Sequence, residues 1–265
     1  PVSVGDLFAG ALLPGILLVS LYLSYVLFKA ATAPASCPAT PVPADEKSQL
    51  VRDFFVALMP PLLLILAVLG SILGGIATPT EAASVGAVGA MVLAAMRWRL
   101  SFRILRETMI ATATITSMVF VILLGASVFS IVFRMMGGDN LVHEFLSNLP
   151  GGPLAAVAVV MIIMFFLGFI LDTFEIIFIV IPITAPVLLM LDIDPIWLGV
   201  LVGVNLQTSF LTPPFGFSLF YLKGVSPPEV KTTDIYRGVA PFILLQIMVL
   251  IAILIFPAFF GMSSS

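Results

Sequence analysis

Long apolar runs dominate the chain, and short polar segments separate them. A membrane-spanning helix needs about 20 mostly apolar residues. Runs of this kind, bounded by charged or proline-rich segments, predict membrane helices at 8–28, 54–76, 82–96, 107–136 and 241–260. The pattern therefore predicts an all-α, polytopic membrane protein.

The segment 153–190 departs from this pattern, because it is too long for one untilted span and holds no loop that could separate two full spans. Its charged residues gather near its middle, at 172–175. We expect a re-entrant helical hairpin whose arms, 153–171 and 176–190, meet at this tip. The next apolar stretch, 197–222, contains two consecutive prolines and predicts a discontinuous helix.

These elements predict four regions along the chain. The first holds a transmembrane helix and a polar loop, and the second holds further transmembrane helices. The third holds the hairpin and the broken helix, and the fourth is a final transmembrane helix. Their expected bounds are 1–53, 54–136, 137–240 and 241–265.

Composition and charge support a membrane assignment. Of the residues, 61% are hydrophobic and 9% are charged, whereas soluble domains carry about 25% charged residues. The formal net charge of −3 argues against a nucleic-acid partner. By the positive-inside rule, the strongest basic cluster marks a cytoplasmic loop; it comprises Arg97, Arg99, Arg103 and Arg106. Trp197 follows an acidic turn on the opposite side, so we expect its ring at the membrane interface.

The sequence lacks the residues needed for disulfides, for most metal sites and for ATP hydrolysis. Cys37 is the single cysteine and His143 the single histidine, which argues against an intrachain disulfide and against metal sites other than one for Na+. No glycine-rich phosphate loop followed by Lys and Ser or Thr is present, so ATP hydrolysis is not expected. We therefore expect a protein that is not an enzyme.

The sharpest polar signal is the break formed by Thr212, Pro213, Pro214 and Gly216. Two prolines remove helical N–H donors and free upstream carbonyl groups, and glycine allows close backbone approach. Polar residues upstream fall on the same helix face as Thr212, namely Asn205, Thr208 and Ser209. Interhelical hydrogen bonding is one explanation of this face. Because the face coincides with the break, an ion or solute site is the favoured explanation.

Asp172 and Thr173 lie at the hairpin tip, where side-chain oxygens and unpaired carbonyl groups can converge. Hard cations such as Na+ prefer oxygen ligands, so the tip is a candidate ion site. Alternatively, Asp172 caps the returning helix by accepting the backbone N–H of Phe174 or Glu175. The two roles are compatible, and the sequence does not choose between them.

A further polar interruption, Thr78-Pro79-Thr80-Glu81, stands between two apolar runs. Thr78 suits the N-cap, Pro79 the first helical position and Glu81 the positive end of a helix. A binding break is the alternative, but the position near a membrane face favours a capped helix start. The small residues that follow, Ser84, Gly86, Gly89 and Ala90, permit close helix packing.

Three stretches of the sequence resemble the large membrane subunit of TRAP transporters, the tripartite ATP-independent periplasmic carriers of bacteria and archaea. They are 75–89, with the run Thr-Pro-Thr-Glu-Ala; 171–173, Leu-Asp-Thr; and 205–220, with the run Leu-Thr-Pro-Pro-Phe-Gly. The resemblance keeps the same order across most of the chain. The family commonly has Leu-Asp-Pro at the hairpin tip, so Thr173 is a departure from its pattern.

The resemblance implies a secondary transporter of the bacterial or archaeal cytoplasmic (inner) membrane, with two inverted repeats and an elevator-type transport domain. This chain would be the C-terminal repeat, with helices of scaffold or arm type at 54–136 and a transport-domain repeat at 137–240. Coupling to a Na+ gradient is implied, as are three kinds of partner besides membrane lipid. They are a small four-helix membrane subunit, a periplasmic substrate-binding protein, and an organic-acid anion such as a C4-dicarboxylate, sialic acid or a keto acid.

The resemblance also implies which residues hold the ligands. The Na+ region maps onto Asp172, Thr173, Thr208, Ser209, Thr212 and Gly216. The substrate pocket maps onto Asn205, Thr212, Pro213 and Pro214. We expect alternating access, in which Na+ stabilises the broken helices so that the anion site forms and the hairpin domain then moves.

Two alternatives stay open: an ion-coupled anion carrier of a related family, and a membrane anchor that organises a complex without transporting a solute. An intramembrane hydrolase is disfavoured. It would need a second deep carboxylate, brought from a separate helix to lie beside Asp172, and the apolar segments offer no such residue.

Overall fold

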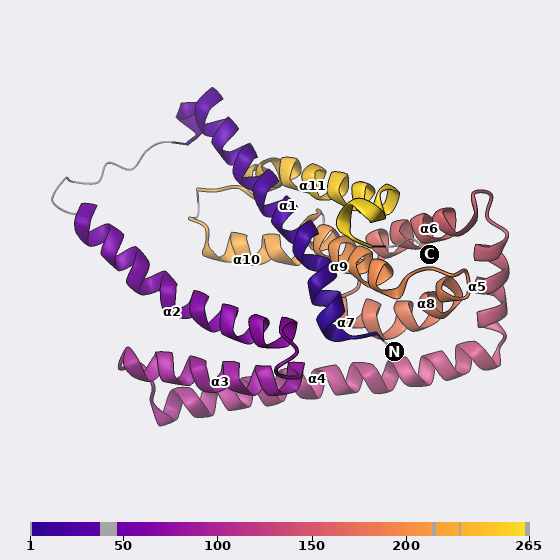
Figure 1. Ribbon diagram of the computed structural model, residues 1–265, viewed down its shortest axis with the longest axis horizontal. Helices are drawn as coiled ribbons and strands as arrows, with labels where there is room; N and C mark the ends of the chain where they lie inside the picture. The colour runs from indigo at the N-terminus through magenta and orange to yellow at the C-terminus, as the bar shows by residue number, and fades with distance from the viewer. Residues whose placement is uncertain (1, 38–46, 214–215, 228, 263–265) are drawn as a thin grey trace. The chain divides into compact units, whose positions relative to one another are not determined.

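The computed structural model describes residues 2–37, 47–213, 216–227 and 229–262, and these residues form helices and turns without any strand (Figure 1). The helices are α1 (Val4–Thr32), α2 (Lys47–Leu73), α3 (Pro79–Met96), α4 (Phe102–Met135), α5 (Gly138–Ser147), α6 (Gly152–Leu167), α7 (Thr173–Glu175), α8 (Ile181–Leu189), α9 (Pro195–Leu211), α10 (Phe217–Val225) and α11 (Thr232–Ile255). A π-helical turn, Ile176–Val180, joins α7 to α8. The predicted all-α fold class is confirmed.

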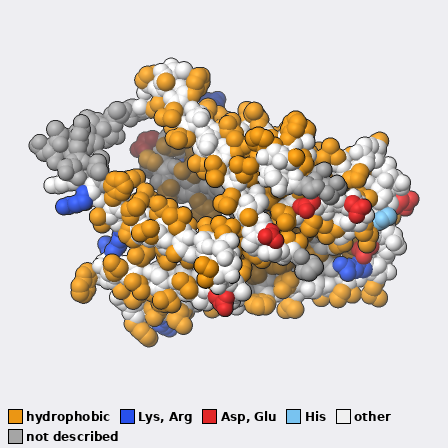
Figure 2. Space-filling model, in the orientation of Figure 1, with side chains coloured by type: hydrophobic (Ala, Val, Ile, Leu, Met, Phe, Trp, Pro, Cys, Tyr) orange, Lys and Arg blue, Asp and Glu red, His pale blue; other side chains and the backbone are white. Residues whose placement is uncertain are grey.

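Within the described residues, five helices are long and apolar enough to cross a membrane: α1, α3, α4, α11 and the part of α2 from Arg52 to Leu73. They correspond to the five apolar runs of the sequence. Hydrophobic side chains cover much of the visible face of the molecule, and charged side chains are sparse there (Figure 2). A surface of this kind is stable in contact with lipid or with other apolar protein surfaces, as in a polytopic membrane protein.

Each of these helices begins before the apolar run that predicted it, and the difference is largest for α2 and α11. Helix α2 begins at Lys47, inside the expected polar loop, and α11 begins at Thr232, inside the expected polar arm. Charged residues do not interrupt a helix whose end reaches water, so polarity is a poor marker of the helix boundary. Pro241, expected at the start of the last span, lies inside α11.

The chain divides into two units. The first comprises residues 3–9 and 24–114, and the second comprises residue 2, residues 10–23 and residues 115–265. In the first unit α2 and α3 lie side by side (Figure 1). A Cβ atom on Gly86 would come within 3.3 Å of Val68, and one on Gly89 within 2.3 Å of Leu64. The prediction that small residues of this helix permit close packing is confirmed at these two positions.

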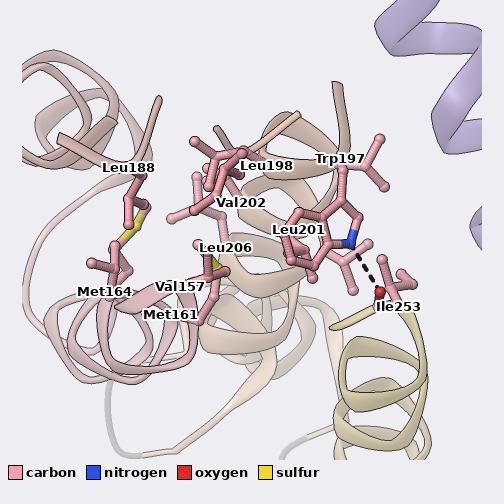
Figure 3. Close-up of a cluster of buried hydrophobic side chains, with 14 of the residues drawn as sticks. Val157, Met161, Met164, Leu188, Trp197, Leu198, Leu201, Val202, Leu206 and Ile253 are labelled. Atoms are coloured by element: carbon pink, nitrogen blue, oxygen red, sulfur yellow. Dashed lines mark hydrogen bonds between the residues drawn. The ribbon is translucent and has the colours of Figure 1, made fainter. Parts of the chain in front are cut away.

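The second unit has a hydrophobic core that α9 shares with α6, α8 and α11 (Figure 3). Trp197 lies in this core with 1% of its surface exposed, and its indole Nε1–H donates to the Ile253 carbonyl oxygen over 2.9 Å. The expectation of an interfacial Trp197 is therefore wrong. The neighbouring Asp194 caps α9 by accepting the Trp197 backbone N–H over 2.7 Å.

Candidate functional site

The polar face predicted on α9 is buried. Asn205, Thr208 and Ser209 each have 0% of their surface exposed, and Thr212 is half-buried at the end of the helix. Buried polar groups need hydrogen-bond partners, because leaving one unpaired costs about 1–3 kcal/mol. The partners of these four residues therefore indicate what the face can do.

Asn205 links two helices of the second unit. Its Nδ2 donates to the Met161 carbonyl oxygen of α6 over 2.8 Å, and its Oδ1 has no hydrogen-bond partner among the described residues. The side chain therefore acts as a buried strut between α6 and α9. Its full burial separates it from solvent, where a solute would first arrive.

The three hydroxyl groups of the face donate to backbone carbonyls of α9 itself. Thr208 Oγ1 donates to Val204 over 2.7 Å, and Ser209 Oγ donates to Leu206 over 2.8 Å. Thr212 Oγ1 donates to the carbonyl of Thr208 over 2.8 Å. A hydroxyl has one proton and two lone pairs. With the protons directed at the backbone, the oxygens present lone pairs, which are the groups that a hard cation prefers.

At the end of α9, Thr212 supplies two hydrogen-bond donors, its backbone N–H and its hydroxyl, to the last carbonyl groups of the helix. Its backbone N–H bonds the Ser209 carbonyl over 3.0 Å, one residue short of the regular helical partner, while its hydroxyl bonds that regular partner, the Thr208 carbonyl. The Ser209 carbonyl, which Pro213 cannot bond, is thereby satisfied. The predicted release of carbonyl groups thus does not hold at Ser209.

The break itself requires a glycine. A Cβ atom on Gly216 would lie 2.9 Å from the Phe210 carbonyl oxygen, so the chain returns close to the end of α9 before α10 begins. Pro213 lies half-buried beside Thr212. Pro214, which the resemblance assigns to the substrate pocket, is outside the described residues.

The hairpin tip is organised by its own carboxylates. Asp172 accepts the backbone N–H of Thr173 over 2.7 Å and that of Glu175, and the Glu175 carboxylate accepts the Asp172 N–H over 3.2 Å. This reciprocal arrangement is a capping box, so the predicted capping role of Asp172 is confirmed at Glu175. The π-helical turn that follows is a rare element, found often at functional sites.

The hairpin and the interrupted helix meet at a position that the sequence did not single out. A Cβ atom on Gly168, at the end of α6, would lie 2.3 Å from Ser209 Oγ and 2.7 Å from Ser209 Cβ. Among the described residues, the hydrogen bonds of the Asp172 side chain stay within 172–175 and do not reach α9. The sequence signal that was available is the glycine at the end of an apolar run.

The third predicted interruption, in the first unit, forms a capped helix start. The Thr78 hydroxyl accepts the Glu81 backbone N–H over 3.4 Å, and the Glu81 carboxylate accepts the Thr78 N–H over 2.8 Å. Pro79 occupies the first turn of α3. The favoured explanation, a capped helix start, is confirmed.

Residues 1–259 match the family described as Tripartite ATP-independent periplasmic transporter, DctM component. The sialic acid TRAP transporter large permease protein SiaM of Vibrio cholerae serotype O1 is 26% identical over 264 residues, 97% of this chain and 59% of that protein. The ectoine/5-hydroxyectoine TRAP transporter large permease protein UehC of Ruegeria pomeroyi is 26% identical over 257 residues, 96% of this chain and 58% of that protein. The C4-dicarboxylate TRAP transporter large permease protein DctM of Rhodobacter capsulatus is 28% identical over 260 residues, 97% of this chain and 57% of that protein.

The chain thus spans between half and two thirds of the length of these three curated relatives. The similarity extends over nearly the whole chain instead of resting on one motif, and the apolar helices agree with a multi-pass membrane protein. The relatives are named as transporter permeases and not as enzymes. The chain belongs to the DctM component family of the tripartite ATP-independent periplasmic transporters.

Proposed function

We propose that this chain forms part of the large membrane subunit of a Na+-coupled importer of organic acids, in the cytoplasmic membrane of a bacterium or archaeon. The solute is a carboxylate of the C4-dicarboxylate, sialic acid or keto acid type. A periplasmic substrate-binding protein delivers it, and a small four-helix membrane subunit completes the complex. The families and solutes named for the relatives support this assignment.

One observation carries the proposal: a buried face of hydroxyl groups ends at an interrupted helix and packs on the arm of a hairpin. The hairpin arms are short for full spans, since α6 has 16 residues and rises about 24 Å at 1.5 Å per residue. Interrupted helices at membrane depth occur where the freed groups line a cavity or contact a ligand. We therefore place the tip, Asp172 and Thr173, and the helix end at Thr212 on the path of the ion.

Thr212 is the residue we assign first to Na+. It is the most exposed hydroxyl of the α9 face, and its proton is directed at the Thr208 carbonyl, so its lone pairs remain for a cation. Thr208 and Ser209 lie behind it and are fully buried. Na+ at this position stabilises the end of α9 and the turn to Gly216, and the carboxylate of the solute then binds beside the ion and Pro213. Alternating access follows when the hairpin and the interrupted helices move together.

The test is uptake of radiolabelled organic acids into proteoliposomes that hold the whole protein with its small subunit and binding protein. Uptake should require an inward Na+ gradient. Thr212→Val removes the hydroxyl at nearly constant volume, and we expect the Na+ concentration for half-maximal uptake to rise about tenfold, which corresponds to about 1.4 kcal/mol. Thr212→Ser restores the hydroxyl and should restore the Na+ dependence.

A matched control is Thr112→Val in α4, because the Thr112 hydroxyl also donates to a backbone carbonyl four residues earlier, over 2.8 Å. This variant should leave the Na+ dependence unchanged. Uptake that ignores Na+ in the unmodified protein would overturn the coupling. Failure to take up any acid would favour the membrane-anchor alternative.

A further inference from the structure

The densest positive charge of the chain lies where α3 ends and α4 begins. Four arginines, Arg97, Arg99, Arg103 and Arg106, stand within ten positions, and Glu107 is the single acidic residue beside them. All four arginines are exposed. We call residues 96–106, which run from the last residue of α3 into the first turns of α4, the basic loop.

Only part of this charge is used within the protein. Arg97 donates to backbone carbonyls of α2, and Arg103 Nε lies 3.7 Å from the Glu107 carboxylate. Within the described part of the chain, no ion pair or side-chain hydrogen bond engages Arg99 or Arg106. At the start of α4, helix stability does not explain the placement either, because a cation in the first turn, such as Arg103, opposes the helix dipole.

Large apolar side chains stand out from the same loop. Trp98 is 96% exposed, Phe102 is 83% exposed and Met96 is 71% exposed. The Trp98 backbone adopts a positive φ of 55°, which is uncommon for a bulky residue. Tryptophan rings are enriched at the level of lipid headgroups, where one part of the ring is apolar and the N–H is wet. The loop therefore presents an aromatic side chain and unpaired cations together.

We propose that the basic loop binds the headgroups of anionic phospholipids. Arg99 and Arg106 contact the phosphates, and Trp98 and Phe102 enter the boundary between headgroups and acyl chains. Charge complementarity selects an anionic headgroup over a neutral one. The exposed aromatic side chains, at the ends of two helices long enough to span a membrane, select a lipid over a soluble anion. The positive-inside rule uses the same charges for topology but does not require any preference among lipids.

The test uses Trp98 as its own reporter. The whole protein is reconstituted in vesicles that contain phosphatidylglycerol or phosphatidylcholine brominated near the top of the acyl chains, and tryptophan quenching is measured. The difference in fluorescence quenching between the unmodified protein and the Trp98→Phe variant is the contribution of Trp98. We expect this contribution to be half-maximal at an at least about fivefold lower mole fraction of brominated phosphatidylglycerol than of brominated phosphatidylcholine. Equal quenching by the two lipids would overturn the proposal.

Two further measurements test whether the arginine charges cause the preference for phosphatidylglycerol. Replacing Arg99, Arg103 and Arg106 together by Gln should abolish the preference, whereas Lys29→Gln with Arg237→Gln, which removes exposed charges elsewhere, should preserve it. A salt titration of the unmodified protein needs no variant: about 0.5 M NaCl should remove most of the preference by screening. A preference that survives both the arginine replacement and high salt contradicts the proposal.

Discussion

The Nη2 atom of Arg97 lies 3.0 Å from the carbonyl oxygen of Val56 and 3.4 Å from that of Ala57. In an α-helix these two oxygens accept the N–H groups of residues four positions later. Those residues are Pro60 and Pro61, which have no N–H. A side chain from the end of α3 thus supplies the donors that α2 lacks, and it ties the two helices together at that point.

Arg97→Met should therefore destabilise the α2–α3 pair. The variant keeps an apolar stem but leaves both carbonyls without the guanidinium, and we expect a loss of about 1 kcal/mol because the site is exposed. Thermal unfolding in detergent and hydrogen exchange of α2 amides measure it. The matched control is Arg99→Met, whose side chain has no hydrogen bond among the described residues.

A double-mutant cycle separates this cause from a general charge effect. Pro60→Ala with Pro61→Ala restores the two N–H groups, so Val56 and Ala57 regain helical donors. In that background the cost of Arg97→Met should fall by about half or more, since the two changes share one interaction. An unchanged cost would mean that the carbonyls of Val56 and Ala57, which the prolines leave without donors, are not the reason for the position of Arg97.

In the second unit, Trp197 likewise donates a hydrogen bond to a backbone carbonyl that lacks its helical donor. Its indole bonds the carbonyl oxygen of Ile253, whose regular helical donor would be residue 257, again a proline. Trp197→Phe keeps most of the buried volume but leaves this buried carbonyl unpaired, so we expect a loss of about 1–3 kcal/mol. The thermal midpoint of the variant measures the effect. Trp98→Phe, at a 96% exposed site, should leave the midpoint unchanged; equal midpoints for the two variants would contradict the assignment.

At Gly168 the hairpin arm lies in close contact with α9. Gly168→Ala places a Cβ atom 2.3 Å from Ser209 Oγ, so the two helices must separate, at an expected cost of about 1–3 kcal/mol. Uptake and thermal stability should both fall, and adding Ser209→Gly should recover part of the loss. In contrast, Gly203→Ala in α9 meets nothing within 4 Å and should be tolerated. Equal behaviour of the two alanine variants would rule out the close approach as the cause.

Features with a local cause could be predicted from the sequence. The apolar runs became helices because length and composition determine a membrane helix without reference to distant residues. The helix caps at Thr78 and Asp172 could be predicted because a cap involves residues about three positions apart, and the structure shows both as capping boxes. The two interruptions of the candidate site, at 172 and 212, also appear where the sequence placed them.

Features that depend on how helices face one another could not be predicted. Trp197 was expected at an interface, yet its partner Ile253 is 56 residues away, and only the packing of α9 against α11 brings them together. The double proline after Thr212 was interpreted as a helix break that frees upstream carbonyls. At Val56 and Ile253 the freed carbonyl instead receives a side chain from another helix. Single-sequence patterns reveal which donor is missing but not which residue replaces it.

Asn205 tests whether the polar face of α9 serves structure or ligand. The resemblance assigns it to the substrate pocket, whereas its full burial and its hydrogen bond to Met161 indicate a strut between helices. Asn205→Ala removes the bond and leaves a cavity, so we expect lower stability by about 2 kcal/mol and fewer active transporters. Asn205→Leu fills the volume and removes the unpaired Oδ1, so stability should largely return.

The kinetic readout separates the two roles. If Asn205 only holds two helices together, its replacement lowers the amount of folded, active transporter. Maximal uptake then falls while the KM for the solute stays within about twofold in both variants. A substrate contact raises KM in both variants, and most in Asn205→Leu, where an apolar group would face the carboxylate. When Asn205 is replaced, the Met161 carbonyl oxygen keeps its regular helical donor, the N–H group four residues later in α6. We therefore expect α6 itself to stay intact in both variants, so that their KM values can be compared. A raised KM with unchanged thermal stability would return Asn205 to the substrate pocket.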